Sequence, residues 1–207
     1  MTGPVDRPPP PAHAGVAEMK RMRATTTGRL RRRPGPSRLL AALTAIPVLT
    51  GFAPAPPKPA VTVAFPQGWR IVARGDLVSA RHPAEHARCN RDLTRIPDSD
   101  QTLQAELDQT LTAPWGAAEW AAFLGAPVDK VELLATTARP SGPRQVRTAA
   151  LLIHAGATPV TRQAVHAVMA VQRTPGWVVI AACYAPVRWY PAERGAMEGA
   201  VGSLRVE

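Results

Sequence analysis

The chain has 207 residues, 45% of them hydrophobic, which is enough for one domain with a core. The net charge of +10 is uneven: nine Lys/Arg oppose two Asp/Glu in residues 1–55, which leaves +3 on the remainder. A basic surface must belong to the folded domain to indicate nucleic-acid binding, so we predict no nucleic-acid partner.

The first sixty residues have the pattern of a targeting region. Residues 1–28 include a proline-rich stretch and predict a disordered extension, or else the true start is Met19 or Met22. Residues 29–60 combine a basic run, an apolar run over 39–53 and a proline-rich linker, the layout of a secretory signal peptide. We therefore expect a periplasmic or secreted protein.

The alternative is an uncleaved anchor in the inner membrane formed by residues 39–53. Those fifteen residues are short for a membrane span, which needs about 20. We expect membrane contact only through this segment, and only if it is not cleaved.

The rest, 61–207, predicts a single α+β domain. Short alternating strands are expected at 61–65, 69–74 and 77–81, joined by tight turns as in an antiparallel meander. Residues 82–100 are polar and are interpreted as a loop with a short strand around 89–96.

Helical periodicity follows. Leucines at every fourth position predict a helix over 103–111, and a second helix fits 115–124. Strands are expected at 131–137 and 147–154, and a last helix begins at Pro191.

Residues 161–184 predict a long β-hairpin at the centre of the sheet. A two-residue Pro-Gly turn has the wrong twist for a hairpin, so a three-residue loop, Thr174–Gly176, is expected. That register places Ala167, Met169 and Val171 on one face with Trp177, Val179, Ala181 and Cys183. Both faces are apolar, so helices must cover both. The fold class predicted is a mostly antiparallel sheet covered by helices on both faces, an α+β sandwich.

These features resemble a known group. An extended start ending in Phe65-Pro-Gln-Gly-Trp69, a helix pair, a strand series, an apolar strand ending at Cys183 and a terminal helix resemble the PsbP-like/DcrB-like α-β-α sandwich proteins over residues 61–207. The resemblance implies the fold. The group contains accessory proteins of membrane complexes and other envelope proteins, and it shares no catalytic residues.

The chain has two cysteines, Cys89 and Cys183. In an exported chain an even count favours a disulfide, with two buried free thiols as the alternative.

The histidines give weaker signals. His82, His86 and Cys89 have a spacing that could ligate zinc or copper, but a disulfide would use Cys89 and no second group of ligands is evident. We interpret the segment as a solvated loop and predict no metal and no cofactor. His154 and His166 lie on expected strands and are interpreted as structural.

Five tryptophans stand out. Core or rim packing is the default, and a ligand or partner surface is the alternative. The candidates for such a surface are Trp115, Trp120, Trp177 and Trp189.

No catalytic or nucleotide-binding motif is evident, so the first hypothesis is an exported, non-enzymatic interaction or accessory module whose partner is a protein or an envelope component. The alternative is a periplasmic small-molecule or lipid binder with a cleft beside Trp115, Trp120 or Phe123. A third is an enzyme of unrecognised type, with His154 or His166 beside an acid in a cleft.

Overall fold

The computed structural model describes residues 54–158 and 161–207. The predicted extension, the signal segment and the alternative anchor at 39–53 lie outside the described residues. Within the linker, residues 54–60 have no regular secondary structure, and Lys58 pairs with Asp76. No helix in the described part of the chain is long and apolar enough to cross a membrane.

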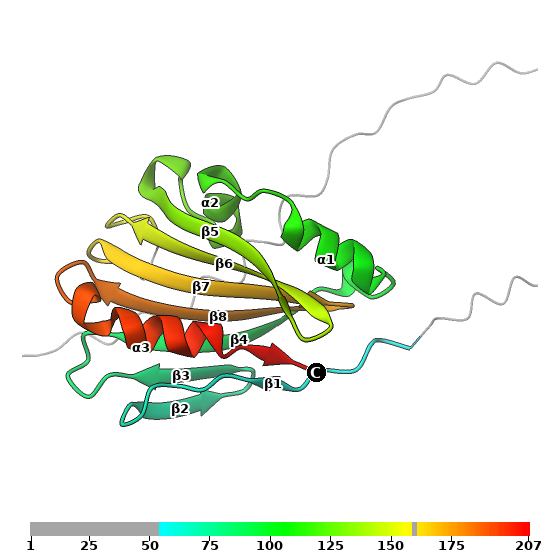
Figure 1. Cartoon of the computed structure of the whole chain (residues 1–207), viewed down its shortest axis with the longest axis horizontal. Helices are drawn as coiled ribbons and strands as arrows, with labels where there is room; N and C mark the ends of the chain where they lie inside the picture. Colours follow the sequence, from blue (N-terminus) through cyan, green and yellow to red (C-terminus); the bar gives the residue numbers. More distant parts are fainter. Residues whose placement is uncertain (1–53, 159–160) are drawn as a thin grey trace, which may run out of the picture. The chain divides into compact units, whose positions relative to one another are not determined.

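The domain is built on a seven-stranded sheet in which every neighbouring pair is antiparallel (Figure 1). Its order is β2-β3-β4-β8-β7-β6-β5. The strands are β2 (Arg70–Arg74), β3 (Leu77–Arg81), β4 (Arg88–Arg95), β5 (Val131–Ser141), β6 (Arg144–Ile153), β7 (Val165–Thr174) and β8 (Trp177–Pro186). A separate pair, β1 (Val61–Thr62) with β9 (Arg205–Val206), joins the two ends of the domain.

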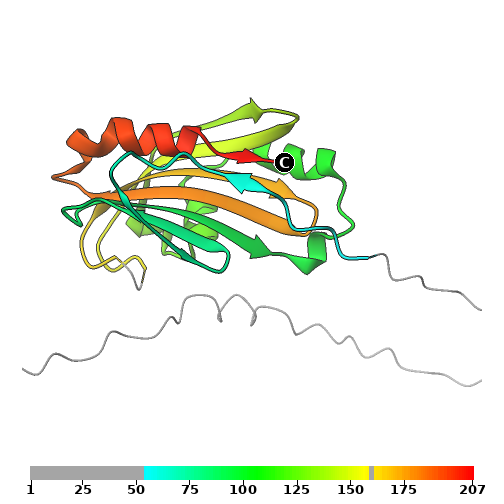
Figure 2. The ribbon, with the colours of Figure 1, turned by 90° about the horizontal axis from the view of Figure 1, so that it is seen from below.

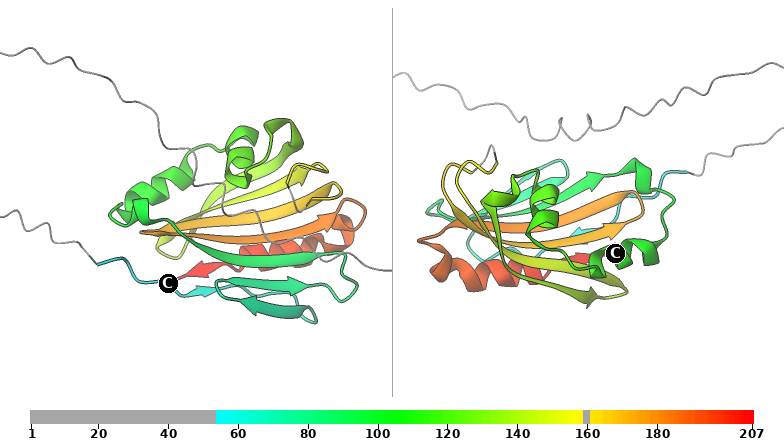
Figure 3. Two further views of the ribbon diagram at one scale, coloured as in Figure 1. Left: turned by 180° about the vertical axis from the view of Figure 1, so that it is seen from behind. Right: turned by 90° about the horizontal axis from the view of Figure 1, so that it is seen from above.

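Helices cover both faces of the sheet, as predicted. α3 (Tyr190–Gly202) lies on one face, in front of the strands in Figure 1 and behind them in the rear view of Figure 3. It buries Met197, Ala200 and Val201 against β4, β7 and β8. α1 (Gln104–Thr112) and α2 (Ala117–Leu124) bury Leu111 and Trp120 on the other face. The predicted α+β sandwich is confirmed.

Two short 3₁₀ turns, η2 (Pro97–Ser99) and η3 (Val128–Lys130), lead into α1 and β5 respectively. Figure 2 shows α3 along one side of the sheet, with β9 running on from its end beside β1. The terminal helix is thereby fixed at both ends, and its first turn is held at the edge where β8 finishes.

β4 differs most from the sequence expectation. A short strand is present where one was expected, but it is an inner strand of the sheet and pairs with β8 along its whole length. Only Cys89 and Leu93 are buried in it, and the other six residues are three arginines and three further polar residues. The sequence of β4 resembles that of a loop because one face of the strand is only partly covered, so polar residues are tolerated there. The strand is held in the sheet by its pairing with β3 and β8.

The hairpin register predicted from sequence is wrong by one residue. Thr174 pairs directly with Trp177, so Pro175 and Gly176 form a two-residue turn. Gly176 has φ 74°, which the third position of a type II turn requires. A one-residue slip exchanges the faces of a strand. Val179, Ala181 and Cys183 therefore share the α3 side with Val168 and Ala170, not with Met169.

Tertiary contacts explain why this turn is tolerated. The Gly176 carbonyl accepts from Ile96 N at 2.7 Å, and its N–H donates to Ser99 O at 3.2 Å. A Cβ at position 176 would collide with Arg95, Asp100 and Pro56. Packing against the β4–α1 connection thus offsets the unfavourable twist of Pro-Gly.

Candidate functional site

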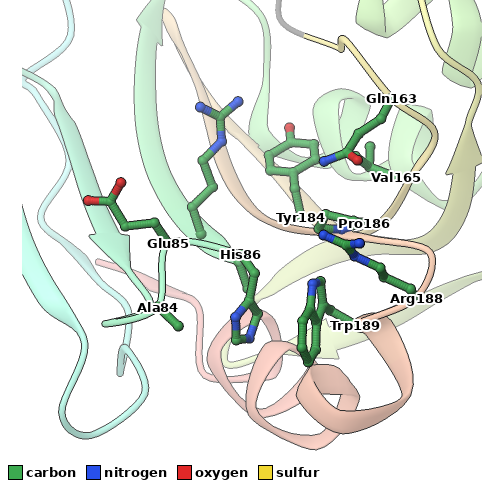
Figure 4. Close-up of a pocket in the computed structure, with 11 residues that line it drawn as sticks. Ala84, Glu85, His86, Gln163, Val165, Tyr184, Pro186, Arg188 and Trp189 are labelled. Atoms are coloured by element: carbon green, nitrogen blue, oxygen red, sulfur yellow. The ribbon is translucent and has the colours of Figure 1, made fainter.

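The chemically richest part of the described domain lies where the β3–β4 loop meets the start of α3. The loop contributes His82 and His86, the segment after β8 contributes Arg188 and Trp189, and the first turn of α3 contributes Glu193. Figure 4 shows the His86 imidazole beside the Trp189 indole at the edge of a pocket.

The β3–β4 loop is a tight, internally bonded turn. His82 N donates to Ala87 O at 3.0 Å, and Glu85 N donates to His82 O at 2.8 Å. Glu85 has φ 56°, the one positive value at a non-glycine position in the described ranges. Such a conformation costs about 1–2 kcal/mol outside glycine, and strain of this kind gathers at functional sites. Its effect here is to place His82 and His86 side by side.

Four rings form a continuous row across the site. Trp69 meets His82 edge-on at 5.5 Å between centroids, and His82 lies 4.0 Å from His86. His86 then stacks on Trp189 at 4.6 Å with an interplanar angle of 18°. The imidazoles are therefore held between two indoles, which restricts their rotation.

Glu193 joins the two histidines. Its Oε1 lies 2.9 Å from Nε2 of His86 and 3.7 Å from Nε2 of His82. The three side chains are 13%, 15% and 25% exposed for Glu193, His86 and His82. Their ligand atoms all lie within 4.8 Å of one another, so these residues could hold a metal ion.

Beside this cluster is an open pocket of about 430 Å³. The Arg88 guanidinium lies 5.6 Å from the centre of the Tyr184 ring, and that of Arg188 lies 5.6 Å from the centre of a Trp189 ring. Both arginines line the pocket together with Gln163. In Figure 4 the side chains of Tyr184, Gln163 and Arg188 lie on the same side of it. Burial raises the pKa of the Tyr184 hydroxyl, so this group stays protonated and can donate a hydrogen bond.

The aromatic groups in the pocket hold the cations without neutralising them. Among the described residues, no carboxylate lies within ion-pair distance of Arg88 or Arg188. Glu85, which also lines the pocket, pairs instead with Arg70 at 3.3 Å. The pocket therefore presents two guanidinium groups available to an anion.

Of the four tryptophans proposed as a surface, the structure places only Trp189 here. It is 39% exposed. Trp120 is fully buried, so its assignment to a surface is wrong: it fills the space between α2 and the sheet. Trp115 packs on Trp120 and Phe123 at 4.9 and 5.7 Å.

Trp177 lies elsewhere, under the Arg95 guanidinium at 5.3 Å. The cleft hypothesised beside Trp115, Trp120 or Phe123 is a packed interface, because the three rings contact one another above the sheet. This arrangement argues against the small-molecule or lipid site at that position.

Cys89 and Cys183 are joined by a disulfide. Because Cys89 is bonded, it cannot serve as the third ligand that the sequence suggested beside His82 and His86. Glu193 takes that place from a helix 107 residues beyond His86. The spacing of the two histidines in the sequence does not indicate Glu193 as a partner.

The other two described histidines are apart from this cluster, and neither lines the pocket beside His86 or the pocket beside the end of α3. His154 lies 4.0 Å from an exposed Glu132. His166 stacks on Tyr190 at 4.2 Å, and burial lowers the pKa of its imidazole. The enzyme hypothesis required one of them beside an acid inside a cleft. His154 lies beside an acid, but neither histidine lines either of these two pockets.

The fold resembles solved structures at low sequence identity. Cyanobacterial PsbP (CyanoP) from Synechocystis sp. PCC 6803 matches with a TM-score of 0.44 and 14% identity, over 76% of this chain and 96% of that one. LpqN, involved in cell envelope biogenesis of Mycobacterium tuberculosis, matches with 0.45 and 10%, over 75% and 87%. The Saccharomyces cerevisiae Ran-binding protein Mog1p matches with 0.43 and 14%, over 70% and 89%.

The PsbP-like group that the sequence resembles is represented among these matches by CyanoP, at a TM-score of 0.44. No protein-family model matches the sequence, and no curated protein matches it.

Proposed function

We propose that this protein is an exported, non-enzymatic binding module that recognises an anionic group of a partner protein or envelope component. The pocket at Arg88, Arg188 and Trp189 is its recognition site. One observation carries the proposal: two guanidinium groups, each held over an aromatic ring, face a pocket where no described carboxylate neutralises them.

The chemistry of the pocket favours a carboxylate or phosphate. Arginine presents a planar fork of donors that matches these groups, and stacking on a ring reduces the entropy lost when the fork is fixed. The Tyr184 hydroxyl adds a neutral donor, and Trp189 adds an apolar wall. An acidic side chain or a phosphorylated component would satisfy both parts of this surface.

Export is supported by two features of different kinds. The segment 29–60 has the layout of a signal peptide, and the Cys89–Cys183 disulfide suits an oxidising compartment. Cell fractionation checks this part: a full-length chain that stays in the cytosol with reduced cysteines would contradict it.

Site-specific photo-cross-linking tests the recognition site. A benzophenone amino acid at Val187, which is 45% exposed next to the pocket, should give a discrete adduct in the envelope fraction. The same probe at Leu103, 67% exposed before α1, is the matched position elsewhere on the domain.

Combining the Val187 probe with Arg88→Ala and Arg188→Ala should abolish the adduct, because both cations are lost. Arg74→Ala removes an exposed arginine at the far end of β2 and should leave the adduct intact. An adduct that survives loss of both pocket arginines would show that the pocket does not recognise an anion.

A further inference from the structure

We propose that His82, His86 and Glu193 form a binding site for one zinc ion, at the edge of the pocket. This inference does not rest on the proposed anion recognition. It begins from a juxtaposition that only the folded chain creates, since Glu193 comes from α3 and both histidines come from the β3–β4 loop.

The distances fit a tetrahedral ion. Bonds of about 2.0–2.1 Å to nitrogen and oxygen place neighbouring ligand atoms roughly 3.3 Å apart. The Glu193 oxygen lies 2.9 Å from Nε2 of His86 and 3.7 Å from Nε2 of His82, on either side of that value. All three ligand atoms lie within 4.8 Å of one another. Shifts of a few tenths of an ångström at the two contacts with Glu193, with a further approach of the two imidazoles, would close a coordination shell.

The ligand types select the metal. Two imidazole nitrogens and one carboxylate oxygen suit zinc and other late transition metals, whereas magnesium and calcium take oxygen ligands. Three protein ligands leave the fourth position for water or for a group of a partner. Because His86 also lines the pocket, that position lies close to the proposed recognition site.

The surroundings hold the ligands in place. Trp69 and Trp189 flank the two imidazoles, and the loop hydrogen bond from His82 N to Ala87 O closes the turn that carries them. Glu193 sits near the start of α3, whose later residues are anchored in the core. A site whose side chains are already positioned loses little entropy when the ion binds.

Two hydrogen bonds must change. The one between Nε2 of His86 and Oε1 of Glu193, at 2.9 Å, is replaced by bonds from both atoms to the ion. The other involves His82. Ala84 N donates to Nδ1 of His82 at 3.0 Å, which in a neutral ring puts the proton on Nε2. Coordination through Nε2 moves that proton to Nδ1, and the Ala84 N–H then turns to water. Ala84 is exposed, so this exchange costs little. The remaining alternative is a hydrogen-bonded His-His-Glu cluster that holds no metal.

Isothermal titration of the tag-free full chain with zinc sulfate distinguishes these two states. We expect one zinc per chain with Kd on the order of 1 µM or below. His86→Ala and Glu193→Gln should each weaken binding by about tenfold or more. His154→Ala, which changes a described histidine outside the cluster, should leave Kd unchanged.

Cobalt provides a second measurement that does not depend on the folding of a variant. Cobalt bound to two imidazoles, one carboxylate and water should show visible d–d absorption of tetrahedral type, and one equivalent of zinc should remove it. The absence of heat and of absorption would overturn the proposal. So would zinc binding that survives the double change His82→Ala/His86→Ala.

The two proposals can be tested independently of each other. Arg88→Ala and Arg188→Ala leave the three ligands in place and should bind zinc as the wild type does. Loss of the Val187 adduct in those variants with unchanged zinc affinity would support both proposals. Normal adduct formation after Glu193→Gln, with zinc binding lost, would show that the metal is not needed for recognition.

Discussion

Cys89 and Cys183 lie directly opposite each other on the neighbouring strands β4 and β8, and a disulfide joins them. Both are 1% exposed and pack in the core beneath α3. The bond therefore ties the most polar inner strand of the sheet to its most apolar one.

Removal of this bond should destabilise the domain substantially. The two cysteines are 94 residues apart in sequence, and the chain-entropy model then gives roughly 4–5 kcal/mol. Thermal unfolding of Cys89→Ala/Cys183→Ala should show a melting temperature lower by roughly 10 °C. Dithiothreitol should shift the wild type by a similar amount and the double variant not at all. Equal midpoints for the oxidised wild type and the double variant would contradict the stabilising role.

Replacement of Gln172 by methionine should stabilise the protein. Gln172 is fully buried, and neither its amide nitrogen nor its amide oxygen has a hydrogen-bond partner in the described structure. Methionine keeps the unbranched shape and removes a desolvation cost of about 1–3 kcal/mol. Urea unfolding should show a free energy of unfolding higher by about 1 kcal/mol.

Gln104 is the matched control for Gln172. Its amide nitrogen donates to Asp108 and to the Arg173 carbonyl, each at 3.0 Å, and its oxygen accepts from Arg144. Gln104→Met should therefore lower stability. If Gln172→Met also lowers it, the buried amide has a partner that the structure does not show.

Arg147 should be costly to remove although it is a buried cation. Its side chain is 4% exposed and donates to the carbonyls of Leu111 and Ala113, at the end of α1. Burial lowers the pKa of its guanidinium, but those terminal carbonyls have no helical partners and a negative helix end favours the charge.

We expect Arg147→Met to lower the free energy of unfolding by about 2–3 kcal/mol, because the carbonyls of Leu111 and Ala113 lose a charged donor. Arg147→Lys should lower the free energy of unfolding by an intermediate amount. Arg74→Met, at an exposed position, should change stability by no more than about 0.5 kcal/mol. If Arg147→Met leaves the free energy of unfolding unchanged, the desolvation cost of the buried guanidinium cancels the contribution of its hydrogen bonds.

Asp92 should make stability fall as pH rises. Burial, with a smaller contribution from the charge of Asp76, raises the pKa of the half-buried Asp92 carboxyl above its ordinary value of 3.8. From about that pH upward the unfolded chain has released this proton while the folded chain still holds it, so the folded state loses relative stability until its own pKa is passed.

Asp92→Asn removes this dependence. The stability of the variant minus that of the wild type should increase as pH rises from 3.8 through the folded pKa and then stay constant. Urea midpoints from acidic to neutral pH measure this difference, and the other titrating groups cancel in it. A difference that does not vary with pH would contradict the raised pKa.

The sequence by itself determined the class of the fold. Both faces of 161–184 are apolar and must be covered, and the helices predicted at 103–124 and after Pro191 can cover them. These elements can be recognised locally because buried side chains recur with the period of the helix or strand that carries them. The even number of cysteines in a chain with a signal-like segment favoured a disulfide over two free thiols, and the structure contains that disulfide. Strand and helix positions were close to those observed for the same reason.

Only the tertiary structure decided the register of the hairpin, the inner place of β4 and the composition of the site. Local pattern cannot show that Gly176 docks on Ile96 and Ser99, which stabilises a turn whose intrinsic twist is unfavourable. Nor can it show that Glu193 meets His86, since the packing of α3 on the sheet closes that distance across 107 residues. Periodicity reports which side chains are buried, whereas side chains far apart in sequence meet only through the packing of whole elements.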